Sequence, residues 1–179
     1  MLNHRNCTAV AIASVAAVGL VSAACGGGTS SGTAVTTACQ TAYKTWANGP
    51  HGRAAFNQIS TDVGIVTSDL QDVAGSRQAA SAVTVTFNEG GKLGTDSAHA
   101  LQNPPPSCVP GFAKPYHAAL IDSQQGAVHI VDAMTALRGG NQSAATSSVN
   151  AFASEVGGAQ MNIKAAVAAL TRHSLSWGG

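Results

Sequence analysis

Charged side chains are scarce: Lys, Arg, Asp and Glu make up 9% of the 179 residues, against roughly 25% in typical soluble proteins. The chain has nine basic and eight acidic side chains, and Arg5 is the one basic residue among the first 24, so a chain processed there would carry eight of each. This balance gives no net charge for long-range attraction to a nucleic acid or another anionic surface. We therefore predict that nucleic acids are not partners.

Motifs of several common chemistries are also missing. The chain has no Cys-x-x-Cys, no His-Glu-x-x-His and no phosphate-binding loop ending in Gly-Lys-Ser or Gly-Lys-Thr. Glu occurs only at positions 89 and 155, so the Glu-x-x-His pairs of di-iron bundles are absent too. We predict a protein that is not an enzyme and that uses no cofactor.

No apolar run is long enough for a membrane-spanning helix, which needs about 20 residues. The first 24 residues instead have the three parts of an export signal. His4 and Arg5 come first, an apolar stretch follows over 9–20, and small residues occupy 22–24. We therefore predict that residues 1–24 are a signal peptide, removed on export.

The residues around Cys25 resemble the lipobox of bacterial lipoproteins. Val21-Ser22-Ala23-Ala24 places small residues before the cysteine, although Ser22 stands where the family prefers Leu or a similar apolar residue. The resemblance implies that Cys25 is acylated and becomes the new amino terminus. Cleavage after Ala24 by an ordinary signal peptidase is the alternative, and it would leave Cys25 as an unpaired thiol.

Two further cysteines remain after processing, because Cys7 leaves with the signal. Outside the cytoplasm, two lone cysteines in one small domain usually pair. We therefore predict a structural disulfide between Cys39 and Cys108. The preceding segment 25–32 is predicted to be a lipidated cysteine with a flexible Gly/Ser tether, leaving 33–179 as one domain.

Apolar residues spaced three and four apart predict long amphipathic helices. A short helix is expected over about 33–48, where Asn48-Gly49-Pro50 ends it. Three apolar stripes follow, divided by turns near Gly75, Pro104–Pro106 and Gly139-Gly140. Their members are Phe56, Ile59, Val63, Val66, Leu70 and Val73; Tyr116, Leu120, Ala127, Ile130, Met134 and Leu137; and Val149, Phe152, Val156, Ala159, Ile163, Ala166 and Leu170.

Segment 77–102 is the least clear. We expect a helix interrupted or frayed around Gly90, Gly91 and Gly94. Alternating apolar and polar residues in 83–87 leave a β-hairpin as the alternative.

Short connections between the long helices favour antiparallel neighbours. The predicted fold is therefore all-α: an up-and-down antiparallel bundle of four main helices plus a short N-terminal helix. Because the stripes are rich in Ala, we expect close packing and no interior cavity.

The lipobox, the Gly/Ser tether, the Ala-rich helices and the Pro-Pro-Pro break together resemble small helical-bundle lipoproteins of high-GC actinobacteria. This resemblance covers most of the chain. It implies an extracytoplasmic domain anchored by lipid to the outer face of the cell membrane, and it implies no activity.

Up-and-down topology would bring four histidines and five aromatic residues to one end of the bundle. Histidine side chains are good ligands for zinc and copper, and aromatic rings with polar tips often line small-molecule sites. The metal candidates are His51, His99, His117 and His173, and the ligand-binding candidates are Tyr43, Trp46, Phe112, Tyr116 and Trp177.

We therefore expect a non-catalytic, membrane-anchored module that binds a protein or a small molecule. The alternative is an extracytoplasmic carrier of a metal or small molecule at the His- and aromatic-rich end.

Overall fold

The computed structural model describes residues 34–75 and 80–177. These ranges contain helices and no strand. The helices are α1 (Thr37–Asn48), α2 (Arg53–Gly75), α3 (Ala80–Leu101), α4 (Ala113–Arg138) and α5 (Gln142–Arg172). The predicted all-α class is confirmed, whereas the predicted signal peptide, Cys25 and the tether lie outside the described residues.

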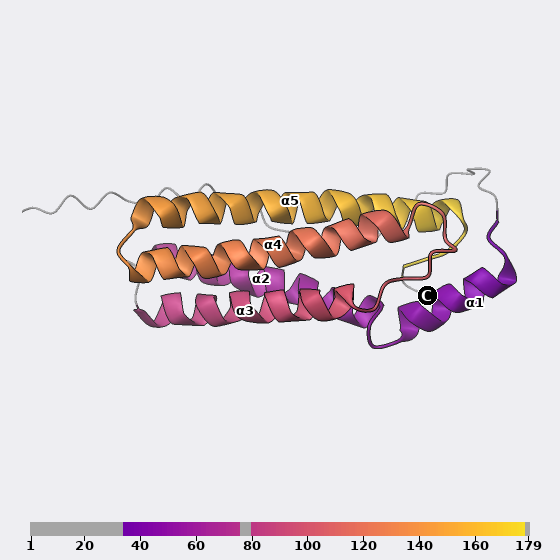
Figure 1. Cartoon of the computed structure of the whole chain (residues 1–179), viewed down its shortest axis with the longest axis horizontal. Coiled ribbons are helices and arrows are strands. Elements are labelled where there is room, and N and C mark those ends of the chain that lie inside the picture. Colours follow the sequence, from indigo (N-terminus) through magenta and orange to yellow (C-terminus); the bar gives the residue numbers. More distant parts are fainter. Residues whose placement is uncertain (1–33, 76–79, 178–179) are drawn as a thin grey trace, which may run out of the picture.

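The four long helices lie side by side along the long axis of the molecule, and α1 lies obliquely at one end, at the right of Figure 1. Consecutive long helices run in opposite directions, with α2 packed on α3, α3 on α4 and α4 on α5. This is the predicted up-and-down bundle with a short N-terminal helix.

The predicted apolar stripes form the core. All six stripe residues of α2 are buried, and so are Tyr116, Leu120, Ala127, Ile130 and Met134 on α4. On α5 the stripe is buried at both ends, whereas Ala159 and Ile163 near its middle are only partly covered.

Two helices have N-cap residues whose side-chain oxygens accept a backbone N–H. Thr36 accepts from Cys39 at 3.3 Å, and Asn141 accepts from Ala144 at 3.1 Å.

The expected interruption of the third helix is wrong, since α3 is continuous through Gly90, Gly91 and Gly94. Gly90 is buried against α4, and a Cβ built there would lie 2.7 Å from Ile130 Cγ2. The glycine therefore lets α3 and α4 approach closely. The hairpin alternative is wrong as well: Thr86 is buried in α3, and its hydroxyl donates to the Ala82 carbonyl at 2.9 Å.

A disulfide joins α1 to the connection between α3 and α4. Cys39 and Cys108 are bonded as predicted, with their Cα atoms 5.7 Å apart. Side chains of α1 add two hydrogen bonds: Trp46 Nε1 donates to the Asn103 carbonyl, and the Tyr43 hydroxyl donates to the Ser176 carbonyl, each at 3.1 Å. We call the end that α1 covers, comprising 34–60, 98–120 and 165–177, the capped pole.

Within the part of the chain that the structure describes, no helix is both long and apolar enough to cross a membrane.

Substitution of the buried glycine tests the close packing of α3 on α4. Gly90→Ala should lower the free energy of unfolding by about 1 kcal/mol, because overpacking costs about 1–3 kcal/mol and exceeds the roughly 1 kcal/mol gained in helix propensity. Gly91→Ala is the matched control: nothing lies within 4 Å of a Cβ there, so it should stabilise the protein. Urea denaturation measures both, and equal effects would contradict the packing.

Removal of the disulfide should destabilise the fold strongly. The bond closes a loop with a sequence separation of 69, and in the chain-entropy model Cys39→Ser/Cys108→Ser should cost about 4 kcal/mol. Thermal and urea unfolding of the double variant measure this cost. A loss under about 1 kcal/mol would show that α1 is held by its side-chain contacts alone.

Candidate functional site

The five aromatic residues predicted at one end of the bundle do come together at the capped pole, with Phe56 as a sixth member. Their ring centroids lie 5.2–6.4 Å from their neighbours, mostly in tilted or edge-to-face pairs. Such distances are those of rings in direct contact. We call this set the aromatic cluster: Tyr43, Trp46, Phe56, Phe112, Tyr116 and Trp177.

The rings fill the space that a bound molecule would need. Phe112 and Tyr116 are fully buried and Tyr43 is nearly so, while Trp46 and Trp177 at the edge are partly exposed. The buried central rings of the cluster therefore close the end of the core.

Burial changes the acidity of both tyrosines. Desolvation raises the pKa of Tyr43 to about 12, although the positive charge of Arg53 lowers it slightly. The pKa of Tyr116 is raised further by desolvation, and secondarily by Tyr43. The Tyr116 hydroxyl is buried and has no hydrogen-bond partner in the described part of the chain. Neither phenol is poised to exchange a proton near neutral pH.

The four predicted metal ligands do not assemble into a site. His51, His99 and His117 are exposed, whereas His173 is buried at the end of α5. Across 34–75 and 80–177, no group of three or more His, Cys, Asp or Glu side chains could hold a metal ion. The geometry thus gives the metal-carrier alternative no ligand set.

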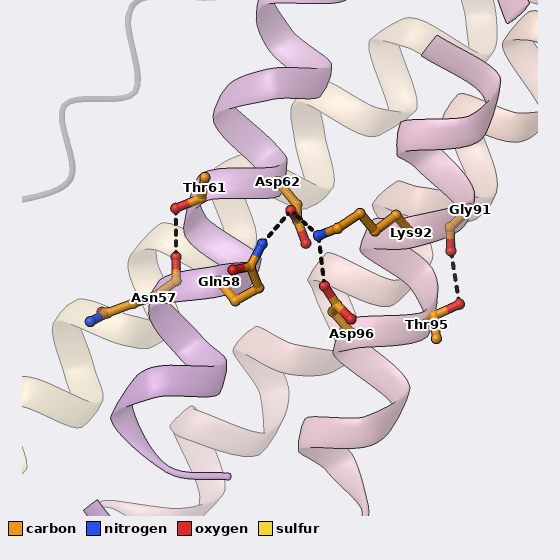
Figure 2. A network of polar contacts seen from close by, with 8 residues as sticks. All are labelled: Asn57, Gln58, Thr61, Asp62, Gly91, Lys92, Thr95 and Asp96. Carbon is orange, nitrogen blue, oxygen red and sulfur yellow. Dashed lines mark hydrogen bonds and ion pairs between the residues drawn. The ribbon is translucent and has the colours of Figure 1, made fainter. Parts of the chain in front are cut away.

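A polar network between α2 and α3 escaped the sequence analysis. Figure 2 shows Lys92 of α3 reaching across to Asp62 of α2, with Nζ 2.6 Å from Oδ1, and also contacting Asp96 at 2.9 Å. Gln58 Nε2 donates to the same Asp62 oxygen at 2.9 Å. Asp62 is fully buried, while the Lys92 side chain is 45% exposed. We call these four residues the polar network.

Charges in the polar network perturb one another. Desolvation is the main effect on Asp62 and raises its pKa, although the hydrogen bond from Lys92 opposes this. The hydrogen bond from Lys92 lowers the pKa of Asp96, and the bond to Asp62 raises the pKa of Lys92. The amine is therefore held protonated and cannot act as a nucleophile. The arrangement clamps α2 to α3 and does not resemble a catalytic centre.

An apolar groove opens between α2 and α5. This seam is packed less closely than the three seams between consecutive long helices. The groove has a volume of about 40 Å³. Ser123 of α4 is also part of its wall, and the Ser123 hydroxyl donates to the Ala119 carbonyl of its own helix. The α2/α5 groove is lined by Phe56, Ile59, Ser60, Val63, Ser123, Val156, Ala159, Gln160 and Ile163.

Comparison with known proteins adds no relative: no protein-family model, no curated protein and no solved structure matches this chain.

Alkaline titration tests whether the aromatic cluster is closed. Near pH 10, half of the tyrosines in an unfolded chain are ionised. The folded protein should show almost no phenolate absorbance there, because both of its tyrosines have raised pKa values. Ultraviolet difference spectra with and without 6 M guanidinium measure this. A folded-state midpoint near pH 10 would mean that the cluster is open to water.

Removal of the bridging amine should be costly at neutral pH. Lys92→Met leaves the buried Asp62 carboxylate without its cation, so the free energy of unfolding should fall by about 3 kcal/mol at pH 7. The pKa of Asp62 is raised in the fold, and loss of Lys92 raises it further. Stability of the variant therefore falls as the pH rises above the ordinary Asp value of about 4. The stability that Lys92→Met loses relative to the wild-type protein should therefore be smaller at pH 4.5 than at pH 7.

Two controls separate this charge effect from lost packing. Asp62→Asn should cost less than about 1 kcal/mol, because it removes the buried charge while Lys92 keeps Asp96. The double variant Asp62→Asn/Lys92→Met should recover most of the stability lost by Lys92→Met. A deficit that is the same at both pH values and in the double variant would contradict the interpretation.

Proposed function

We propose that this chain is a cell-envelope lipoprotein whose helical domain is a non-catalytic binding module for another protein. In this proposal, acylated Cys25 holds the domain at the outer face of the cell membrane. Tethering raises the effective concentration of the domain at that surface, which favours binding of any partner there.

The disulfide supports the extracytoplasmic location. Disulfides persist in oxidising compartments and are rare in the cytoplasm, and Cys39 and Cys108 are bonded in the fold. The lipobox-like residues before Cys25 provide the matching sequence argument for acylation.

The α2/α5 groove is the observation that carries the binding proposal. Pockets for small molecules usually measure about 300–1,000 Å³. At about 40 Å³, the groove is far smaller than such pockets and is of a size for the tip of one apolar side chain. A partner protein that inserts such a side chain fits this geometry.

Acylation is tested by substituting the cysteine. We expect the wild-type protein and Cys7→Ser to incorporate labelled palmitate and to fractionate with membranes, because Cys7 leaves with the signal. Cys25→Ser should do neither. Intact-mass measurement of the processed protein gives an independent readout, and an unmodified Cys25 would disprove the anchor.

Binding at the groove is tested with a photo-crosslinking residue placed at Gln160 in living cells. The control position is the adjacent Met161, which is 69% exposed and does not line the groove. We expect one discrete protein adduct from position 160 only, and its loss when Ala159→Trp fills the groove. Identical adducts from both positions, or adducts that persist in Ala159→Trp, would refute a groove partner.

A further inference from the structure

The fold separates charges that are balanced in the sequence. The capped pole contains four basic side chains and no acidic one. All eight acidic side chains lie in the remainder of the described chain, together with three basic ones, Lys92, Arg138 and Lys164. The basic residues of the pole are Lys44, Arg53, Lys114 and Arg172.

These four cations are not neutralised by carboxylates. Both ion pairs in the described residues involve Lys92, which lies outside the pole. Within 34–75 and 80–177, Arg53 donates to two neutral oxygens, the Trp177 carbonyl at 3.3 Å and Asn48 Oδ1 at 3.1 Å. Lys44, Lys114 and Arg172 are exposed. The positive charge of the pole is therefore available to an outside anion.

Helix dipoles do not cancel this charge. The amino-terminal ends of α2 and α4 and the carboxyl-terminal ends of α3 and α5 all lie at the capped pole. Two positive and two negative dipole ends roughly offset one another, so the side chains determine the sign of the potential.

The described chain also enters at this pole. Ala34 is nine residues from Cys25, and nine residues span at most about 30 Å. The 31 residues of α5 extend about 46 Å further, to the opposite end of the bundle. If Cys25 is anchored in the membrane, the capped pole is the end that can reach the lipid headgroups.

We propose that the capped pole binds the anionic headgroups of phospholipids and acts as a second, electrostatic contact beside the acyl anchor. The charge argument is independent of the anchor, whereas the argument from reach rests on the proposed acylation of Cys25. An acyl chain combined with a basic patch is a known route to stable membrane attachment. The pole therefore orients the bundle upright, with the α2/α5 groove starting at the pole and continuing along the side of the bundle.

Electrostatic adsorption is the form that this contact takes. The exposed large apolar side chains of the described residues all lie outside the pole: Ile65, Val85, Val128 and Met161. Trp46 and Trp177 are engaged in the aromatic cluster. Because none of these fully exposed apolar side chains lies at the pole, its basic side chains should dominate the binding, which should be sensitive to salt.

The test uses the unacylated mature chain, residues 26–179, which retains every helix, the disulfide and the whole core that the structure describes. Co-sedimentation is measured with vesicles of phosphatidylglycerol and phosphatidylcholine (1:1) and of phosphatidylcholine alone. We expect binding to the anionic vesicles at low ionic strength, loss of that binding in 0.5 M salt, and none to the neutral vesicles.

Matched variants locate the contact. Lys44→Gln/Lys114→Gln should weaken binding by roughly 25-fold, since each basic residue near an anionic surface contributes about fivefold. Gln142→Glu/Ser147→Glu changes the net charge equally at the exposed start of α5, at the opposite end, and should change binding less than about twofold. Circular dichroism confirms that both variants fold.

Three results would overturn the proposal: no binding to anionic vesicles at low ionic strength, equal weakening by the two double variants, or retention on a soluble polyanion such as heparin without vesicle binding. The last would indicate a polyanionic partner in place of lipid.

Palmitate labelling of the full-length chain separates failure of this proposal from failure of the proposed function. The pole can bind vesicles although Cys25 is unmodified, and Cys25 can be acylated although the pole binds none.

Discussion

Cys39 and Cys108 tie α1 across the end of the helical bundle, and the buried aromatic cluster depends on that tie. Tyr43 and Trp46 of α1 cover Phe112 and Tyr116, which would otherwise face solvent at the open end of the core. The same helix is where the described chain begins. The disulfide therefore couples closure of the core to the end of the bundle at which the described chain begins, and both follow from one covalent constraint.

The helices that sequence predicts well are those whose buried stripe is aliphatic. The stripe of α2 keeps three-and-four spacing in apolar residues and is buried throughout. The stripe of α3 has the same spacing, but four of its six members are small or polar and conceal the pattern: Val83, Thr86, Gly90, Leu93, Ser97 and Ala100. From sequence alone, Gly90 predicts an interruption of the helix. In the tertiary structure, it instead permits close contact between α3 and Ile130 of α4.

Sequence predicted which aromatic residues meet, because topology determines which helix ends share a pole. It could not predict how closely the rings pack, since that depends on centroid distances of 5–6 Å set by the packing of α1.

Asp62 was missed because its partner is also known only from the tertiary structure. Its position beside Ile59 and Val63 was readable as the edge of an apolar stripe, whereas its partner Lys92 is thirty residues away in the chain. The i, i+4 spacing of Lys92 and Asp96 was the one available signal.

Low charge content makes the few charges at the capped pole effective. With 9% charged residues, there is little surrounding charge of either sign to mask them. Asp62 and Asp122 each lie nine residues from the start of their helices, about 13 Å along the axis and beyond the Debye length of roughly 8 Å at physiological salt. Asp96, which is closer, is held by Lys92. An anion at the end of the bundle therefore meets four basic side chains and little of the opposing charge, although the whole chain has nearly equal totals, nine basic and eight acidic side chains.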